Sequence, residues 1–244
     1  YTPFVSPDLR KVGKVIDDMH ANLPAMTEAY GENGVVYLGA PIVIDDYMLM
    51  TNFPVNSLSD LEGRKIAAPG AAINWLSGTG AVGVSGNLTT YFNELKTGVY
   101  DGVIVFASAA LPGKLFEVAP YITKAGLGAQ YAGSLCANAD WYNGLTEDAR
   151  AALHAGADAA GGWYVDQLEQ AVTTSLDTMA GAGATVSDAP DDMRTAWAEG
   201  MENAAQTWAA ELDGQGKPAT EVLGAYMDAM RSAGAEPLRN WDTE

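Results

Sequence analysis

Apolar residues recur at helical spacing between Leu145 and Met179, and no other feature of the sequence constrains the fold as strongly. The apolar positions are Leu153, Ala157, Ala160, Tyr164, Leu168, Val172, Leu176 and Met179. Thr146 can cap the start of this segment, and acidic residues follow in its first turn, where the helix dipole favours them. The pattern predicts one long helix that packs its apolar face inward, with Gly161-Gly162 as its weakest point.

Before this helix, short apolar strands and short helices alternate. The strands expected are 35–38, 42–44, 64–68, 81–84 and 103–106, and then one or two strands within 121–136 with a break near Gly126. The helices expected are 8–30 with a bend at Pro24, 71–76, 88–96 and 111–118. Strand and helix in turn predict an α/β fold with an open, largely parallel sheet. After Met179 we expect a strand at 184–186, one helix from Pro190 to Leu212 and another from Pro218 to Met230.

Composition limits the class of protein. The 244 residues are enough for one large domain or two smaller lobes, and they contain no apolar run of the ~18 residues that a membrane-spanning helix needs. A net charge of −18, from 13 basic and 31 acidic residues, repels phosphate backbones and excludes nucleic acid as a partner. Cys136 has no second cysteine to pair with, and we expect a small buried thiol there. No charged and apolar targeting segment follows Tyr1, so we expect that any such segment has been removed or was never part of this sequence.

Catalytic and metal-binding patterns are absent. His20 and His154 lie far apart without further ligands at metal-binding spacing, so no metal site is expected. There is no Gly-x-Ser-x-Gly motif of a serine hydrolase. The adjacent acids Asp45-Asp46 are expected to be solvated charges, because neighbouring side chains diverge on a strand as well as on a helix. The sequence therefore predicts a protein that is not an enzyme and has no metal or cofactor.

One glycine pattern supports an alternative. Gly78, Gly80 and Gly83 have the G-x-G-x-x-G spacing that lets a dinucleotide pyrophosphate approach the start of a helix. That motif should follow a strand and open a helix, whereas here a helical segment precedes it and a strand-like segment lies within it. A flexible helix-to-strand turn explains the glycines better. The alternative function is a dinucleotide-binding oxidoreductase that uses these three glycines.

Two longer segments carry a family resemblance. Residues 57–66, Ser-Leu-Ser-Asp-Leu-Glu-Gly-Arg-Lys-Ile, and residues 91–102, Tyr-Phe-Asn-Glu-Leu-Lys-Thr-Gly-Val-Tyr-Asp-Gly, are typical of it. Phe-Glu-Val-Ala-Pro-Tyr at 116–121 and the segment 141–145 fit the same pattern. In these motifs, and over nearly its whole length, the chain resembles the DctP-like extracytoplasmic solute-binding proteins of TRAP transporters.

The resemblance implies a two-lobed, type II-like periplasmic-binding-protein fold with mixed sheets, flanking helices and a long helix that spans the lobes. It places residues 1–46 and 129–172 in lobe I and residues 47–128 and 173–244 in lobe II. It also implies that the first βα units of lobe I precede Tyr1. The expected function is capture of a small organic solute in the periplasm, followed by delivery to the membrane permease when the lobes close.

The same resemblance locates candidate ligand contacts. Positions where the family carries two arginines and an asparagine are here Ala67, Tyr47 or its neighbour Met48, and Val105. These groups cannot neutralise a carboxylate, so we expect simple dicarboxylates to bind poorly. The other candidates near the expected cleft are Asn74, Trp75, Thr90, Phe106 and Ser108. This aromatic and neutral polar set favours a ring-bearing, hydroxylated or cationic solute, with Asn74 and Ser108 fixing its orientation. Trp75 fits a core role equally well, and Tyr91 is expected to pack inward.

Overall fold

The structure, a computed structural model, describes residues 2–244. Its larger sheet has the strand order β4-β3-β5-β2-β6-β8. The strands are β2 (Tyr47–Thr51), β3 (Lys65–Ala68), β4 (Val82–Ser85), β5 (Gly102–Phe106), β6 (Tyr121–Lys124) and β8 (Thr185–Asp188). β3 is parallel to β4 and β5, and β6 is parallel to β8, whereas β2 is antiparallel to β5 and β6. The sheet is therefore mixed, and the prediction of a largely parallel sheet is wrong.

The antiparallel strand β2 is the strand that the sequence pattern missed. All of its residues are buried, because it lies inside the sheet between β5 and β6. A strand that is buried on both faces loses the apolar–polar alternation by which strands are recognised. Its central residues Met48, Leu49 and Met50 also lack the β-branched side chains that favour strands.

A second sheet pairs β1 (Val35–Ile44) with β7 (Gln130–Asn138) in antiparallel register. The segments 35–38 and 42–44 belong to this one strand, whose pairing shifts around Gly39. Gly39 and Ala40 have φ angles of 117° and 52°, so the strand bulges there while its ladder continues on both sides. Cys136 is exposed on β7, contrary to the expected buried thiol. Its neighbour Ala137 belongs to a small buried cluster that includes Ala157 of the long helix. Because adjacent residues of a strand point to opposite faces, Cys136 points away from this cluster.

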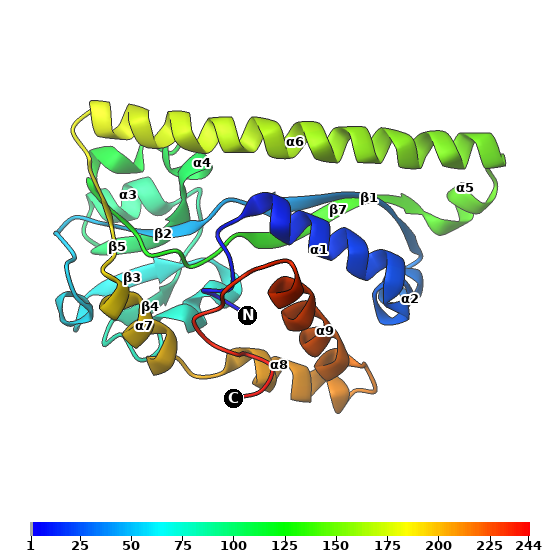
Figure 1. Ribbon diagram of the computed structural model, residues 1–244. Coiled ribbons are helices and arrows are strands. Elements are labelled where there is room, and N and C mark those ends of the chain that lie inside the picture. The colour runs from blue at the N-terminus through cyan, green and yellow to red at the C-terminus, as the bar shows by residue number, and fades with distance from the viewer. Residues whose placement is uncertain (1) are drawn as a thin grey trace.

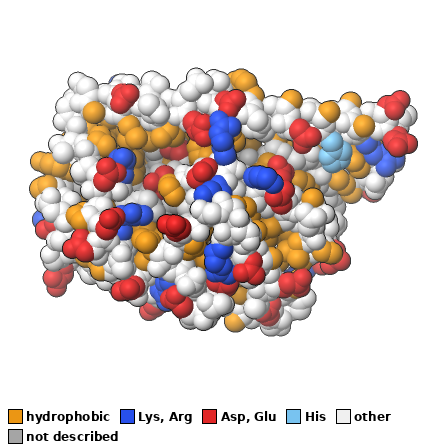
Figure 2. Space-filling model, viewed as in Figure 1, with side chains coloured by type: hydrophobic (Ala, Val, Ile, Leu, Met, Phe, Trp, Pro, Cys, Tyr) orange, Lys and Arg blue, Asp and Glu red, His pale blue; other side chains and the backbone are white. Residues whose placement is uncertain are grey.

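The long helix α6 (Glu147–Gly181) runs along both sheets on one side of the molecule (Figure 1). Thr146 caps it as predicted, with its hydroxyl accepting a hydrogen bond from the Ala149 amide at 3.3 Å. Leu168 and Met179 of the inward stripe are buried. The amino-terminal end of α6 projects with α5 (Ala139–Asn143) beyond the main body (Figure 2). The prediction of a long helix that packs inward is confirmed.

Several shorter helices differ from the prediction. The bent helix is two helices, α1 (Leu9–Asn22) and α2 (Pro24–Glu32), because Leu23 before the proline is extended. The helix expected at 88–96 is α3 (Tyr91–Lys96), and the one expected at 71–76 is a 3-10 helix, Gly70–Leu76. Instead of a helix at 111–118, α4 (Ala107–Ala110) precedes a 3-10 turn, Leu115–Glu117. Lys114 between them has a φ of 53°, which breaks a helix.

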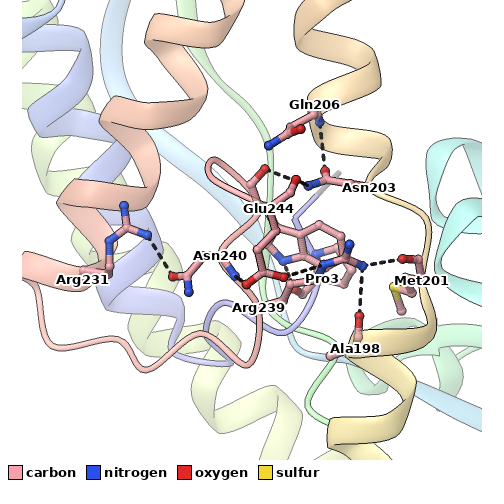
Figure 3. Close-up of polar contacts among 10 residues, drawn as sticks. Pro3, Ala198, Met201, Asn203, Gln206, Arg231, Arg239, Asn240 and Glu244 are labelled. Carbon is pink, nitrogen blue, oxygen red and sulfur yellow. Dashed lines mark hydrogen bonds and ion pairs between the residues drawn. The ribbon is translucent and has the colours of Figure 1, made fainter.

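The single helix expected from Pro190 to Leu212 is also two helices, α7 (Asp191–Gly200) and α8 (Ala204–Asp213). Asn203 restarts the helix by accepting a hydrogen bond from the Gln206 amide at 3.0 Å. Arg239 donates to the carbonyls of Ala198, at 3.2 Å, and Met201, which helix continuation would otherwise use. Figure 3 shows Arg239 and Asn203 holding the carboxyl-terminal segment, residues 235–244, against this junction.

The last helix, α9 (Ala219–Ser232), ends before Gly234, which has a φ of 77°. α9 packs on α8 and α1. On one face of the six-stranded sheet, Leu49 and Ile104 share a core with Trp197 of α7. On the opposite face, Met48 and Val105 share a second core with Met179 of α6. Across residues 2–244, no helix combines the length and the apolar character that crossing a bilayer requires. The division into lobes at the stated residues stays a prediction.

Candidate functional site

Three aromatic side chains meet at one end of the central strands of the six-stranded sheet. Tyr47 and Phe106 are directly paired across β2 and β5, so their side chains lie on the same face. Their ring centroids are 5.2 Å apart, with an interplanar angle of 70°. Trp75, in the 3-10 helix that follows β3, lies 5.2 Å from Tyr47 at an angle of 90°. We call Tyr47, Trp75 and Phe106 the aromatic cluster. It lies where β3 and β5 end, the edge at which α/β sheets commonly bind ligands.

The aromatic cluster contains an unpaired donor. Trp75 is 5% exposed, and its indole Nε1 is buried without a hydrogen-bond partner among the described residues. The backbone carbonyl of Trp75 accepts a hydrogen bond from Trp197 Nε1 at 2.6 Å, which anchors the 3-10 helix to α7. Tyr47 is 7% exposed, and burial, followed by the charge of Asp45, raises its pKa to about 12. Phe106 is half-buried. Buried donors are nearly always paired in proteins, so the free Nε1 is a candidate donor to a ligand.

Asp45 lies beside this cluster and is not solvated, contrary to the sequence prediction. It is 2% exposed. Asp45 precedes Tyr47 by two residues and Ser108 follows Phe106 by two, so the antiparallel register brings Asp45 and Ser108 opposite each other. The carboxylate accepts hydrogen bonds from the Ser108 hydroxyl at 2.6 Å and the Ser108 amide at 3.2 Å. Burial raises the pKa of Asp45, although the two Ser108 donors and the backbone amides of Asp45 and Ala107 act in the opposite direction.

Asp46 lies at the crossing between the two sheets. Its carboxylate accepts a hydrogen bond from the Gly128 amide at 2.7 Å, and the amide of Tyr47 donates to the Gly128 carbonyl at 3.3 Å. The two chain segments that connect the sheets, between β1 and β2 and between β6 and β7, are thereby joined. Burial raises the pKa of Asp46 to about 6, although the Gly128 amide and the positive charges of Arg194 and Lys124 act in the opposite direction.

The other predicted contacts lie apart from the aromatic cluster. Asn74 and Thr90 are exposed. Ala67 and Val105 have no exposed surface and belong to the core on the opposite face of the sheet, together with the buried Tyr91. A Cβ added at Gly86 would come within 2.9 Å of the Ala67 methyl, so this position has no room for a longer side chain. The structure therefore brings together Tyr47, Trp75, Phe106 and Ser108 and leaves the other four elsewhere.

The glycine motif has a packing role. Gly78 has a φ of 74°, and a Cβ there would stand 2.0 Å from the carbonyl oxygen of Gly200 at the end of α7. Only glycine permits this close approach. The motif leads into strand β4 and not into a helix, so its amides do not form the helix start that a pyrophosphate needs.

A cavity of about 830 Å³ lies elsewhere, between α1 and α2 on one side and α8 and α9 on the other. Its walls are mostly apolar and include Met19, Met26, Leu223 and Tyr226. None of the eight predicted contact residues lines it. The aromatic cluster combines rings with a buried carboxylate and an unpaired donor, whereas the cavity is mostly apolar with Glu28, Glu32 and Lys217 among its lining residues.

The two histidines have local roles. His20 stacks on Tyr37 with ring centroids 3.7 Å apart, and burial lowers its pKa to about 4. His154 lies between the Tyr142 hydroxyl, at 2.8 Å, and the Leu38 carbonyl, at 3.0 Å. Within the described part of the chain, no group of three or more His, Cys, Asp or Glu side chains is arranged to hold a metal ion.

Three solved structures with a similar fold are extracytoplasmic solute-binding proteins, and two of them belong to TRAP transporters. The periplasmic ectoine-binding protein of the TeaABC transporter of Halomonas elongata is 22% identical with a TM-score of 0.77, over 94% of this chain and 74% of that chain. A Roseobacter denitrificans protein with bound β-D-glucuronate is 18% identical with a TM-score of 0.77, over 95% and 73%. DctP7 of Bordetella pertussis, which binds pyroglutamic acid, is 19% identical with a TM-score of 0.75, over 94% and 73%.

These structures confirm the predicted fold class, the α/β fold of the two-lobed TRAP solute-binding proteins. No curated protein matches the sequence. Residues 1–211 match DctP, the bacterial extracellular solute-binding protein family 7. Because this match covers most of the 244 residues, the chain belongs to family 7 of the bacterial extracellular solute-binding proteins.

Proposed function

We propose that this protein captures a small organic solute in the periplasm, at the aromatic cluster, and delivers it to the membrane permease of a TRAP transporter. One observation carries the proposal: Tyr47, Trp75 and Phe106 meet at the ends of β3 and β5, beside the crossing between the two sheets. A solute held there would touch residues on both sides of the crossing. The family supports a binding role and not an enzymatic one.

Closure of two lobes is the working step in this proposal. The lobes join at the segments around Asp46 and Gly128 and along α6, so a solute at the cluster favours the closed arrangement. The proposed division at 46/47 and 128/129 falls within these connections, and the division at 172/173 falls within the continuous helix α6. We add one refinement: because α9 packs on α1, helices α8 and α9 move with lobe I.

The solute class follows from the side chains present. The described residues around the cluster offer ring faces, the Ser108 hydroxyl and the Trp75 donor, and none of these groups carries a positive charge. A simple dicarboxylate would leave its charges unpaired here, which costs several kcal/mol. The relatives bind ectoine, glucuronate or pyroglutamic acid, and at 18% to 22% identity none of these ligands transfers directly.

A thermal-shift screen followed by calorimetry tests the proposal. The panel contains ectoine, choline, D-glucuronate, pyroglutamate, succinate and NAD. We expect at least one organic solute to bind in the micromolar range and NAD and succinate to show no binding. The variant Trp75→Phe keeps a ring but removes the Nε1 donor, and it should weaken binding about tenfold, as loss of a buried hydrogen bond does.

Trp163→Phe is the matched control, since Trp163 is 66% exposed on α6, and it should leave affinity unchanged. Binding of NAD, or equal affinity in wild type and Trp75→Phe, would contradict the proposed site.

A further inference from the structure

We propose that Asp45 is the specificity-determining residue of this site and makes it select a solute with a cationic group. This inference rests on the proposed function and specifies its ligand. The observation behind it is that a carboxylate, 2% exposed, lies next to an aromatic cluster and takes part in none of the ion pairs of the described residues.

The carboxylate is held in place by neutral donors only. The Ser108 hydroxyl donates to one carboxylate oxygen and the Ser108 amide to the other, and the backbone amides of Asp45 and Ala107 also act on the group. All of these donors are neutral. Neutral donors fix the orientation of a carboxylate but do not balance its charge. A buried, unbalanced charge is unfavourable unless a cation pairs with it.

The surroundings of Asp45 favour a cation for a second reason. Tyr47, two residues further along the chain, lies edge-to-face with both Trp75 and Phe106. Faces of aromatic rings attract ammonium, amidinium and guanidinium groups, most strongly where water is excluded. The charge of Asp45 also acts on this position, because it contributes to the raised pKa of Tyr47. A carboxylate and ring faces together form a site for a cation and repel an anion.

A structural role alone would not require the charge. Asp45 accepts the Ser108 amide with one oxygen and the Ser108 hydroxyl with the other. An asparagine oxygen could accept the same amide, and its NH2 group could donate to the Ser108 hydroxyl. Asp45→Asn therefore removes the charge and keeps an acceptor of the same shape. Asp177→Asn is the control, because it makes the same change on an exposed carboxylate of α6.

The test is calorimetry at pH 8 with choline, its uncharged isostere 3,3-dimethyl-1-butanol, ectoine and D-glucuronate. We expect wild type to bind choline or ectoine at least tenfold more tightly than the alcohol and D-glucuronate. Asp45→Asn should lose at least tenfold in affinity for the cationic probe, and Asp177→Asn should stay within twofold of wild type. The wild-type preference for choline over the alcohol tests the proposal even where Asp45→Asn fails to fold.

Two results would overturn the inference and are distinguishable. Tight binding of D-glucuronate with no binding of choline or ectoine would reject the role of Asp45 and leave the proposed solute-binding function standing. Unchanged affinity for the cationic probe in a folded Asp45→Asn variant would also reject the role of Asp45 and leave the proposed function standing. Absence of binding by all four probes would contradict the proposed function itself.

Discussion

The two sheets contact α6 through different kinds of side chain. The β1–β7 sheet approaches α6 through small residues: a Cβ added at Gly161 would be 3.0 Å from the Ala40 Cα. Tyr164 adds a hydrogen bond to the Val43 carbonyl at 2.9 Å. On the six-stranded sheet, Met179 is fully buried in the core that contains Met48. The first contact therefore depends on close backbone approach and the second on burial of large apolar side chains, and different substitutions should break them.

The largest effect is expected at the centre of α6. Leu168→Asp would bury a charge without a partner, because Leu168 is 9% exposed and packs in the main core. This change should cost about 4 kcal/mol or more, enough to unfold a domain of ordinary stability. Circular dichroism against temperature measures it. Trp163→Asp, at an exposed position of the same helix, is the control, and a Leu168→Asp variant that melts within about two degrees of wild type would show that this stripe faces solvent.

Truncation of Met179 tests the contact with the six-stranded sheet. Met179→Ala removes a side chain with no exposed surface and should cost about 2 to 5 kcal/mol through lost burial and a residual cavity. Urea unfolding measures this loss. Thr178→Ala, an exposed neighbour on α6, should change the free energy of unfolding by about 0.5 kcal/mol or less. If both variants lost the same free energy of unfolding, the contact of α6 with the six-stranded sheet would not depend on burial of Met179.

The crossing between the sheets should depend on pH through Asp46. Its pKa is about 6 in the folded protein and about 3.9 in an unfolded chain, so the folded state binds the proton more tightly. The resulting stability is fully present below pH 3.9 and is lost as the pH rises through about 6. We expect this site to reduce the free energy of unfolding by about 1 to 2 kcal/mol between pH 4 and pH 7, discounted because Asp46 is only half-buried.

Asp46→Asn removes this titration and keeps the acceptor for the Gly128 amide. Its melting temperature relative to wild type should therefore rise between pH 4 and pH 7. A constant difference across that range would mean that Asp46 has an ordinary pKa and that the crossing is solvated.

The smallest expected effect is a difference in stability between alanine substitutions at two adjacent glycines of α6. Gly162 has open space around it, so Gly162→Ala should stabilise the protein by about 0.5 to 1 kcal/mol, the usual gain in a helix. Gly161→Ala should lose that gain or destabilise, because its Cβ would press on the Ala40 backbone. Urea unfolding of both variants compares them, and equal stabilisation would show that β1 does not approach α6 closely.

Local signals in the sequence explain why α6 was predicted well. A long apolar stripe and a threonine cap determine a helix without help from distant residues, and the helix starts one residue after Thr146 as expected. The break between α7 and α8 has distant causes instead. Arg239 takes the carbonyls of Ala198 and Met201, and Gly78 packs on Gly200. Because Arg239 and Gly78 lie outside residues 190–212, the local sequence could not predict the break.

The site was predicted in part for the same reason. Aromatic residues near strand ends indicated Tyr47, Trp75 and Phe106, but their meeting depends on the register of β2 with β5. Because β2 was missed, the pairing of Asp45 with Ser108 could not be predicted, and Asp45 was placed in solvent. The i, i+2 spacings from Asp45 to Tyr47 and from Phe106 to Ser108 are the signal that would have revealed it once the register was known.

The aromatic cluster as the solute site is the central claim, and the affinity of Phe106→Ala tests it most directly. Phe106 is half-buried, so its removal should disturb folding less than removal of Trp75. Calorimetry with the tightest-binding solute of the panel should show a loss of about 1 to 3 kcal/mol, roughly 5- to 150-fold in Kd, with the melting temperature close to that of wild type. An unchanged Kd in folded Phe106→Ala would contradict the account and place the solute elsewhere.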